Sequence, residues 1–209
     1  MPIDFNPHIQ FNSNINTPHR IIQQSVAFTG QLEKDTFTKS VKVDSSNVDN
    51  KYEGLKIEKK SFGTIKKTGE EATLYTITNK NGMVMKVTDF GAILVSVLVP
   101  DKNGVLTDVV LGYDHGEDYQ VNPPHFGATI GRNGNRIKDA SFVLNGKKIQ
   151  LTPNENENNL HSGPDGFEFM MWEAEAKEQA VAFRHHSPDG EQGFPGNFDV
   201  TVTYTLTDD

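Results

Sequence analysis

The sequence predicts an all-β protein whose fold is an antiparallel β-sandwich. Apolar residues make up only 35% of the 209 residues, and glycine, proline and asparagine are frequent. Short segments in which apolar and polar residues alternate follow one another closely, with turn-forming residues between them. This pattern favours many short antiparallel strands over long helices, and a chain of this length suits one all-β domain.

The first clear strands lie between residues 71 and 100. Residues 71–78, EATLYTIT, alternate and are followed by the turn sequence NKNG. Residues 83–100 are long enough to hold two strands, and we expect a break near Asp89–Gly91 because glycine inside a strand pattern often marks a bend. Pro100 ends the second of these strands.

The middle of the chain continues the same pattern. After a DKNG turn, residues 105–113 predict the returning strand. Pro123–Pro124 exclude a helix or a central strand around them. Asn145–Gly146, set between alternating residues, predicts a hairpin over residues 142–151.

The last third of the chain predicts two strands and contains one helical candidate. Residues 180–186 and 197–206 alternate as strands do. Residues 170–179, MMWEAEAKEQ, are the only helical candidate and are short for a helix.

The two ends of the chain differ from the predicted domain, which spans residues 55–209. Residues 1–54 show no sustained period, which predicts a flexible or loosely docked extension, although stretches such as RIIQQSVAFTG leave open an extra strand. At the other end, the strand at 197–206 is followed at once by a turn-initiating composition. A strand without its partner exposes an unpaired edge, so we expect the chain to be a truncated form.

The bulk composition excludes several classes of function. A net charge of −8 and a pI of about 5.3 argue against nucleic acid and anionic membrane surfaces as partners. No apolar run approaches the roughly 20 residues that cross a bilayer. The N-terminus lacks the pattern of a secretory signal and the chain has no cysteine, which together favour a cytoplasmic location.

The most informative stretch runs from Phe126 to His161 and is rich in hydrogen-bonding groups. Its segment GRNGNRI places Arg132 and Arg136 four residues apart with asparagines beside them. These groups suit sugar hydroxyls better than an apolar ligand or a phosphodiester. The alternative is that the glycines only make a bend and the arginines form surface ion pairs. The segment is not a phosphate-cradling loop, because it lacks both the Gly-Lys-Ser/Thr ending and the dinucleotide pattern.

His161 is the best placed of the histidines. It lies in the segment NNLHSG, where Asn158, Asn159 and Ser162 add hydrogen-bonding groups, although a lone histidine in a polar loop is more often a surface residue than a catalyst. His185–His186 would point to opposite faces of a strand and cannot converge on one ion. No zinc-ligand spacing appears, so we expect no metal site.

Residues 186–196, HSPDGEQGFPG, combine proline, glycine and acidic residues. This composition is typical of an elaborate turn between strands. Asp189 and Glu191 are candidate carboxylates for the site if this turn faces Arg136 and His161.

Three motifs in order, GATIGRNGNRI, NNLHSGPDGF and SPDGEQGFPG, resemble the aldose 1-epimerase (galactose mutarotase) family. DFGAILVSVLVPDKNG and DVVLGY resemble the family's first strands, so the resemblance covers about Leu55 to Asp209. It implies an antiparallel sandwich of the galactose mutarotase-like (supersandwich) type, here incomplete, with the sugar in an open cleft on one sheet.

The resemblance also implies an activity. Enzymes of the family interconvert the α and β anomers of aldohexoses such as galactose and glucose by acid–base opening and closure of the ring, without metal or organic cofactor. The asparagine and arginine of the family's NRI motif, here Asn135 and Arg136, contact sugar hydroxyls, as does the histidine of its LHGG motif, here His161.

The chain departs from the family pattern in two respects. Ser162 replaces a glycine of the LHGG motif. The family's general acid, a histidine in an NHxYFNL-like segment, and its late general base, a glutamate, do not occur before Asp209. No residue of the chain is therefore assigned a catalytic role, and we expect the acid and base beyond Asp209.

Our sequence hypothesis is that the intact protein is an aldose 1-epimerase and that this chain alone is inactive. The alternative is a non-catalytic carbohydrate-binding module on the same scaffold, and a third possibility is a truncation product that does not fold. A sugar-phosphate epimerase is less well supported because no phosphate-binding cluster is present. The sequence does not indicate an oligomeric state.

Overall fold

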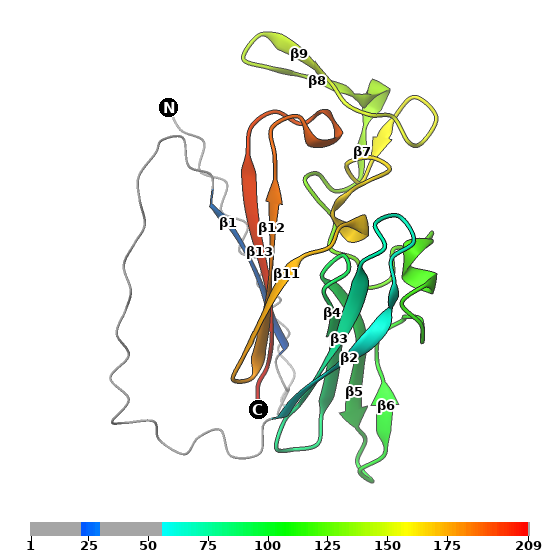
Figure 1. Cartoon of the computed structure of the whole chain (residues 1–209), viewed down its shortest axis with the longest axis vertical. Coiled ribbons are helices and arrows are strands. Elements are labelled where there is room, and N and C mark those ends of the chain that lie inside the picture. The colour runs from blue at the N-terminus through cyan, green and yellow to red at the C-terminus, as the bar shows by residue number, and fades with distance from the viewer. Residues whose placement is uncertain (1–21, 30–55, 209) are drawn as a thin grey trace, which may run out of the picture.

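The computed structural model describes residues 22–29 and 56–208, where almost all regular structure is β-strand (Figure 1). The strands form two larger sheets and two short ribbons. Neighbouring strands in every sheet are antiparallel. The all-β antiparallel fold predicted from the sequence is confirmed.

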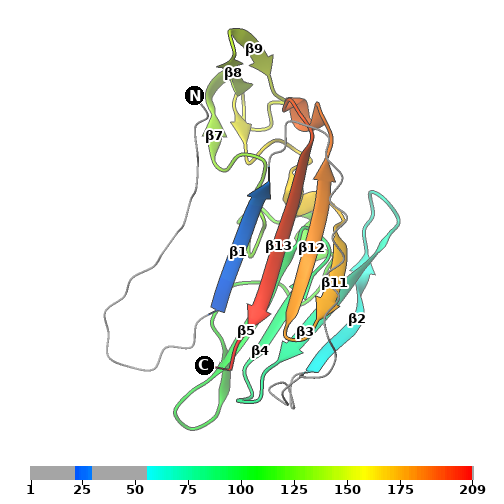
Figure 2. The ribbon, with the colours of Figure 1, turned by 90° about the vertical axis from the view of Figure 1, so that its left-hand side faces the viewer.

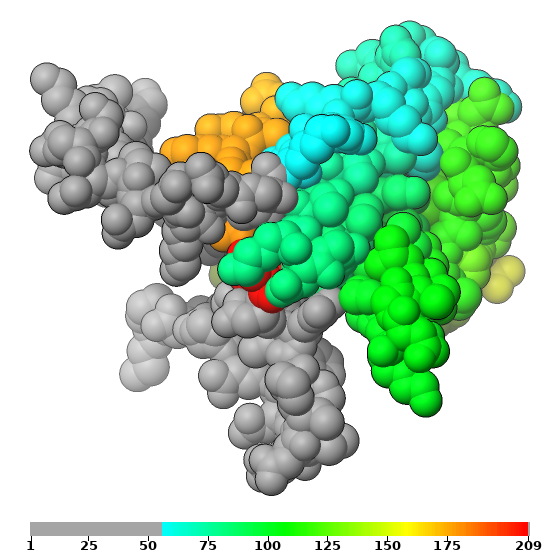
Figure 3. All heavy atoms as spheres, turned by 90° about the horizontal axis from the view of Figure 1, so that it is seen from below, coloured from blue at the N-terminus to red at the C-terminus, as the bar shows by residue number. Residues whose placement is uncertain are grey.

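The larger sheet has five strands in the order β2-β3-β4-β5-β6. Their bounds are β2 Lys56–Thr64, β3 Glu71–Thr78, β4 Val84–Thr88, β5 Ile93–Pro100 and β6 Leu106–Asp108. Seen from below, this sheet is a continuous slab coloured cyan to green, from which the bright green β5–β6 hairpin projects (Figure 3).

The second sheet has four strands in the order β1-β13-β12-β11. Their bounds are β1 Ile22–Thr29, β11 Glu173–Lys177, β12 Ala180–Ser187 and β13 Phe198–Leu206. Figures 1 and 2 show that this sheet lies face to face with the five-stranded sheet, which makes the two layers of a sandwich.

Short elements occupy the end of the sandwich where β12 and β13 are joined. β7 pairs with β10, and β8 pairs with β9 in a hairpin (Figure 1). Their bounds are β7 Arg136–Ile137, β8 Ser141–Leu144, β9 Lys147–Gln150 and β10 Asn159–Leu160. Four single 3₁₀ turns complete the regular structure of the described residues: Asp118–Gln120, Lys138–Ala140, Phe167–Phe169 and Glu191–Gly193.

The main core lies between the two sheets. Alternate residues of β13, such as Val202, are buried against β12, where Phe183 is fully buried. Ile77 of β3 and Met85 of β4 approach from the opposite sheet and belong to the same apolar cluster. Burial of these side chains, each worth about 1.5–3 kcal/mol, is the main force that holds the layers together.

The five-stranded sheet is also covered on its other face. Leu74, Ile93 and Val95 join a second cluster there, together with Phe62 and the fully buried Tyr119 from the loop after β6. Because this sheet is covered on both faces, residues 93–99 are apolar at nearly every position instead of alternating.

Most of the predicted strands are confirmed. β3 coincides with residues 71–78, and the predicted break near Asp89–Gly91 separates β4 from β5. The hairpin turns at Asn145–Gly146, between β8 and β9. β12 and β13 match the two strands predicted near the end of the sequence.

Two expectations of local structure need correction. The helical candidate at residues 170–179 is wrong: residues 173–177 form β11, whose burial alternates with a period of two. The returning strand at 105–113 is shorter than predicted, because β6 ends at Asp108. The Asp108 carboxylate accepts hydrogen bonds from the Val97 and Val110 amides at 3.0 and 3.2 Å, so a side chain takes over the pairing there.

Part of the predicted extension, residues 1–54, is described. Ile22–Thr29 forms β1 and pairs with β13 along its whole length, from Ile22 opposite Leu206 to Thr29 opposite Asp199. This is the extra strand that the sequence left open. It gives β13 a neighbour on each side, since β12 pairs along the other side, so the unpaired edge expected for residues 197–206 was wrong. The rest of that prediction lies outside the described residues. Within residues 22–29 and 56–208, no helix has the length and apolar character needed to cross a membrane.

The bend between β4 and β5 brings the chain into very close contact with the segment before β11. Gly91 has a φ of 67°, and its amide donates to the Met170 carbonyl at 2.7 Å. A Cβ atom on Gly91 would lie 2.3 Å from the Glu168 carbonyl oxygen. Only glycine meets both requirements, the left-handed backbone and the missing side chain.

The same bend is bonded to two further segments. The Ala92 carbonyl accepts hydrogen bonds from the Tyr204 hydroxyl of β13 at 2.8 Å and from the Thr129 hydroxyl at 2.9 Å. Burial raises the pKa of Tyr204 to about 12, so the hydroxyl keeps its proton and remains a donor. The bend therefore connects both sheets to the loop that precedes Arg132.

We predict that Gly91→Ala destabilises the fold far more than Gly104→Ala. Both glycines have positive φ, 67° and 82°, which costs alanine about 1–2 kcal/mol at each position. Only Gly91 is crowded, since nothing lies within 4 Å of a Cβ on Gly104, and forced overpacking adds about 1–3 kcal/mol. Urea unfolding measures the difference, and equal losses in the two variants would contradict this account of the bend.

Candidate functional site

The candidate site is built where two loops are joined by a short pair of strands. The first loop passes beside the start of β5, where the Leu94 amide donates to the Gly127 carbonyl at 3.0 Å, and it ends in β7. β7 pairs with β10 so that Leu160 lies opposite Arg136. This register places His161 beside Asn135, although the two residues are far apart in the sequence.

Asn135 and His161 are joined by two hydrogen bonds. The Asn135 amide donates to Nδ1 of His161 at 3.0 Å, and the His161 amide donates to the Asn135 carbonyl at 3.1 Å. Since Nδ1 accepts a hydrogen bond from the backbone, neutral His161 carries its proton on Nε2. The ring therefore offers an N–H donor from Nε2.

The charge state of His161 agrees with this arrangement. Partial burial lowers the pKa of His161, and the neighbouring His125 and Arg136 lower it further. Glu155 acts in the opposite direction. The neutral ring is thus favoured at physiological pH, as its bond to the Asn135 amide requires.

Arg136 forms a two-pronged ion pair with Glu155. Its Nε and one terminal nitrogen donate to the two carboxylate oxygens at 2.5 and 2.6 Å, and its other terminal nitrogen donates to Oδ1 of Asn135 at 3.1 Å. The pair raises the pKa of Arg136 and lowers that of Glu155. Asn135, Arg136 and His161, the three residues predicted from the sequence, are therefore brought together.

Glu155 was not predicted from the sequence. It lies among the alternating asparagines and glutamates of NENENN, where nothing distinguishes it from Glu157. An acidic residue in the loop before His161 was the only available signal, because the pairing with Arg136 depends on how the loop folds back.

The asparagines and the serine around His161 mainly hold the loop together. Asn159 is fully buried and donates to the Thr152 carbonyl at 2.7 Å. Ser162 is also buried, and its hydroxyl accepts from the Asn133 amide at 2.6 Å and donates to the Asn133 carbonyl at 3.0 Å. The sequence suggested that these side chains add to a binding pocket, but Asn159 braces its own loop and Ser162 braces that loop against the one that contains Asn133.

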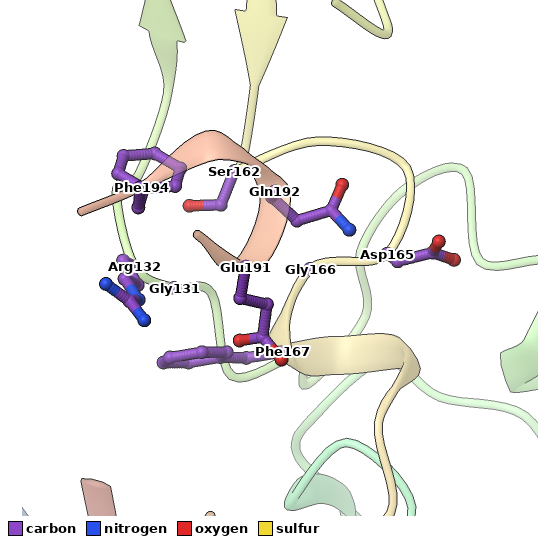
Figure 4. A pocket seen from close by; sticks show the side chains of 9 residues that line it. All are labelled: Gly131, Arg132, Ser162, Asp165, Gly166, Phe167, Glu191, Gln192 and Phe194. Atoms are coloured by element: carbon purple, nitrogen blue, oxygen red, sulfur yellow. The ribbon is translucent and has the colours of Figure 1, made fainter. Parts of the chain in front are cut away.

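Arg132 has a structural role. Its guanidinium donates five hydrogen bonds to the turn after β12, four of them to main-chain carbonyls. The acceptors are the hydroxyl and carbonyl of Ser187 and the carbonyls of Pro188, Pro195 and Gly196, at 2.7–3.2 Å. Figure 4 shows the junction, where Gly131–Arg132 meets the 162–167 loop and the 191–194 turn. Of the two arginines, Arg136 is therefore the one associated with the site.

The carboxylates of the turn after β12 serve its own structure. The Asp189 carboxylate accepts from the Gly196 amide. Glu191 accepts from the Ser187 hydroxyl and lies 3.6 Å from Nε2 of His185. These hydrogen bonds and ion contacts do not involve Arg136 or His161, the two residues that the turn was expected to face.

The adjacent histidines of β12 point to opposite faces, as the sequence predicted. His185 packs against the rings of Phe167 and Trp172, each 5.2 Å away between centroids, whereas exposed His186 pairs with Asp199 at 2.6 Å. A groove of about 380 Å³ lies over β11, β12 and β13 beside His186. None of the three predicted site residues lines that groove.

Candidate metal ligands do not cluster in the described part of the chain. Across residues 22–29 and 56–208, no group of three or more histidine, cysteine, aspartate or glutamate side chains could hold an ion. The chemistry of the site is that of hydrogen-bond donors and acceptors.

Fold and contacts together define an antiparallel β-sandwich protein with a partly exposed cluster of hydrogen-bonding side chains, Asn135, Arg136 and His161. A model of the aldose 1-epimerase family matches residues 73–209, about two thirds of the chain. The chain belongs to the aldose 1-epimerase family.

Individual relatives agree with this assignment. The chain is 39% identical over 142 residues to the aldose 1-epimerase of Escherichia coli. The aligned region covers 68% of this chain and 41% of that protein. It is 41% identical over 120 residues to the galactose mutarotase of Homo sapiens, covering 57% of the chain and 35% of that protein. The chain thus spans about two fifths of the length of the curated relatives it matches.

A solved structure shares the fold. The GalM/aldose epimerase homologue from C. elegans superposes with a TM-score of 0.62 at 35% identity, covering 66% of this chain and 42% of that one. The match confirms the galactose mutarotase-like sandwich that the sequence motifs implied.

We predict that Arg132→Lys destabilises the protein and Arg184→Lys does not. Lysine cannot reproduce the planar five-donor fork, so several carbonyls lose their partner, at a cost of about 2–4 kcal/mol in total. Arg184 makes a single exposed pair with Glu175 at 2.8 Å, whose change is worth less than about 0.5 kcal/mol. Thermal unfolding compares the two variants. An Arg132→Lys variant with the unfolding temperature of the wild type would show that the five hydrogen bonds are not needed for stability.

Proposed function

We propose that the intact protein is an aldose 1-epimerase that interconverts the α and β anomers of hexoses, and that Asn135, Arg136 and His161 bind the sugar hydroxyls. The names of the matched relatives support the activity. The observation that carries the site is the hydrogen bond from the Asn135 amide to Nδ1 of His161, which leaves a proton on Nε2. A histidine with a fixed N–H donor can address one oxygen of a sugar.

The neighbouring groups complete a surface suited to hydroxyls. A hydroxyl both donates and accepts hydrogen bonds, and the cluster supplies guanidinium donors, an amide oxygen and a carboxylate within one contact network. Planar pairing with Glu155 holds the Arg136 fork in one orientation, which reduces the ordering cost of binding.

We further propose that these residues hold the sugar and do not carry out both proton transfers. Arg136 remains charged at any physiological pH and asparagine does not titrate, so neither can act as the acid or the base. The proposal assigns residues 55–209 to the epimerase sandwich and residues 1–54 to an extension, with an aldohexose as the partner, no cofactor, and a cytoplasmic location.

The first test is sugar binding by the chain, with Arg136→Leu compared with Arg184→Leu. The two arginines are matched controls, since each pairs with a glutamate and each side chain is 53% exposed. We expect galactose and glucose to bind the wild type, and Arg136→Leu to lose about tenfold or more in affinity because charged hydrogen bonds are removed. Titration calorimetry measures this, and equal affinities in the two variants would place the sugar elsewhere.

Polarimetry of freshly dissolved α-glucose then separates binding from turnover. We expect the chain to leave the rate of mutarotation at the buffer value, because the acid and base are not among its assigned residues. An acceleration by the chain would contradict that division. If the intact protein binds the sugar and does not accelerate the reaction, it is a non-catalytic carbohydrate-binding protein and the epimerase proposal fails.

The pH dependence of binding tests the role of neutral His161. Its pKa is lowered from the ordinary value of 6.5, so fewer than half of the rings are protonated at pH 6.5 and the midpoint of protonation lies below that pH. We expect affinity to weaken as the pH falls, with half of it lost only below pH 6.5, as protonation breaks the bond from the Asn135 amide. Affinity that halves above pH 6.5 would contradict this assignment.

A further inference from the structure

A buried carboxylate lies next to the candidate site and has no part in the contacts of Asn135 or Arg136. Glu168, in the 3₁₀ turn before β11, has a side chain only 3% exposed. One oxygen, Oε1, lies 2.7 Å from Nδ1 of His125, and the other has no hydrogen-bond partner among the described residues. Burial raises the pKa of Glu168, and the interaction with His125 opposes that shift.

His125 connects this carboxylate to the site. Its backbone has a φ of 55°, and its amide donates to the Asn122 carbonyl at 2.9 Å. Its side chain is 30% exposed, so the ring reaches from the interior, where Glu168 holds Nδ1, to the surface. At the surface it meets His161, with the ring centroids 4.6 Å apart and the planes at 70°.

His161 is thus held on two sides. The Asn135 amide bonds its Nδ1, and the His125 ring packs against its ring in an edge-to-face arrangement. Glu168 is placed in turn by the β4–β5 bend, because its carbonyl oxygen lies against Gly91. A continuous series of contacts runs from the fold's main bend to the histidine of the site.

We propose that Glu168 and His125 are positioning residues that hold His161 in the orientation and tautomer needed to bind a sugar oxygen. A carboxylate bonded to one ring nitrogen prevents the imidazole of His125 from rotating without loss of that bond. The fixed ring then limits rotation of His161, whose Nδ1 stays on the Asn135 amide. The sugar part of this inference rests on the proposed function, and the positioning part does not.

Imidazole NMR of the ¹⁵N-histidine-labelled chain tests the positioning directly. In the wild type we expect a single Nε2–H tautomer for His161. In His125→Ala and in Glu168→Gln we expect mixed tautomers or a broadened signal, together with an Asn135 amide that exchanges about tenfold faster, the equivalent of one lost hydrogen bond. A purely structural ion pair would leave the His161 tautomer unchanged.

His186→Ala is the matched control. His186 lies on β12, away from the site, and its ring pairs with the Asp199 carboxylate at 2.6 Å. We expect its removal to leave the His161 signals unchanged. If His125→Ala does not fold, Glu168→Gln decides, because it keeps the side chain's shape and removes its charge. Unchanged tautomer and exchange in the folded variants would overturn the proposal.

Sugar titration of the same proteins separates this inference from the proposed function. We expect His125→Ala and Glu168→Gln to bind galactose about tenfold more weakly than the wild type and His186→Ala to bind it equally. No binding by the wild type would refute the proposed function, while the NMR result would still decide the positioning. Wild-type affinity in both site variants would overturn the proposal that the pair serves binding.

Discussion

The close approach of Gly91 to the Glu168 carbonyl is the contact on which the arrangement of the sandwich and its site depends. The bend that contains Gly91 is bonded to Tyr204 of the opposite sheet and to Thr129 of the loop that leads to the site. A side chain at this point would push apart segments that come from four places in the sequence. The cores between the layers supply most of the free energy of folding, but this bend determines how the layers and the loops are aligned.

The polar residues of the site region divide into two groups that look alike in the sequence. The first group makes its hydrogen bonds within the protein and consists of Arg132, Asn159 and Ser162, the last two of which are buried. Arg136 and His161 are bonded too, both to Asn135, in a layout that keeps them close to the surface. The β7–β10 register sets which residues face one another here, with Leu160 opposite Arg136 and Asn159 opposite Ile137.

Much of the fold could be predicted because its signals are local. Asn145–Gly146 and the break near Gly91 depend on the conformations that these residues allow, and the alternation of β13 depends on burial of one face. β11 was missed because its alternating Glu and Ala residues have helical propensity, and only pairing with β12 made it a strand. The pairs Arg136–Glu155 and His125–Glu168 could not be predicted, because each joins residues whose approach depends on the whole fold.

The acceptors of Arg132 have a consequence for how this region can change during evolution. Because four of its five bonds end on main-chain carbonyls, most side chains of the turn after β12 take no part in the recognition. These four bonds therefore depend on the backbone path of the turn and not on the identity of those side chains. A substitution that changes this path, for example at Gly190, Gly193 or Gly196, which have φ values of 81–90°, would break the anchor even where Arg132 is kept.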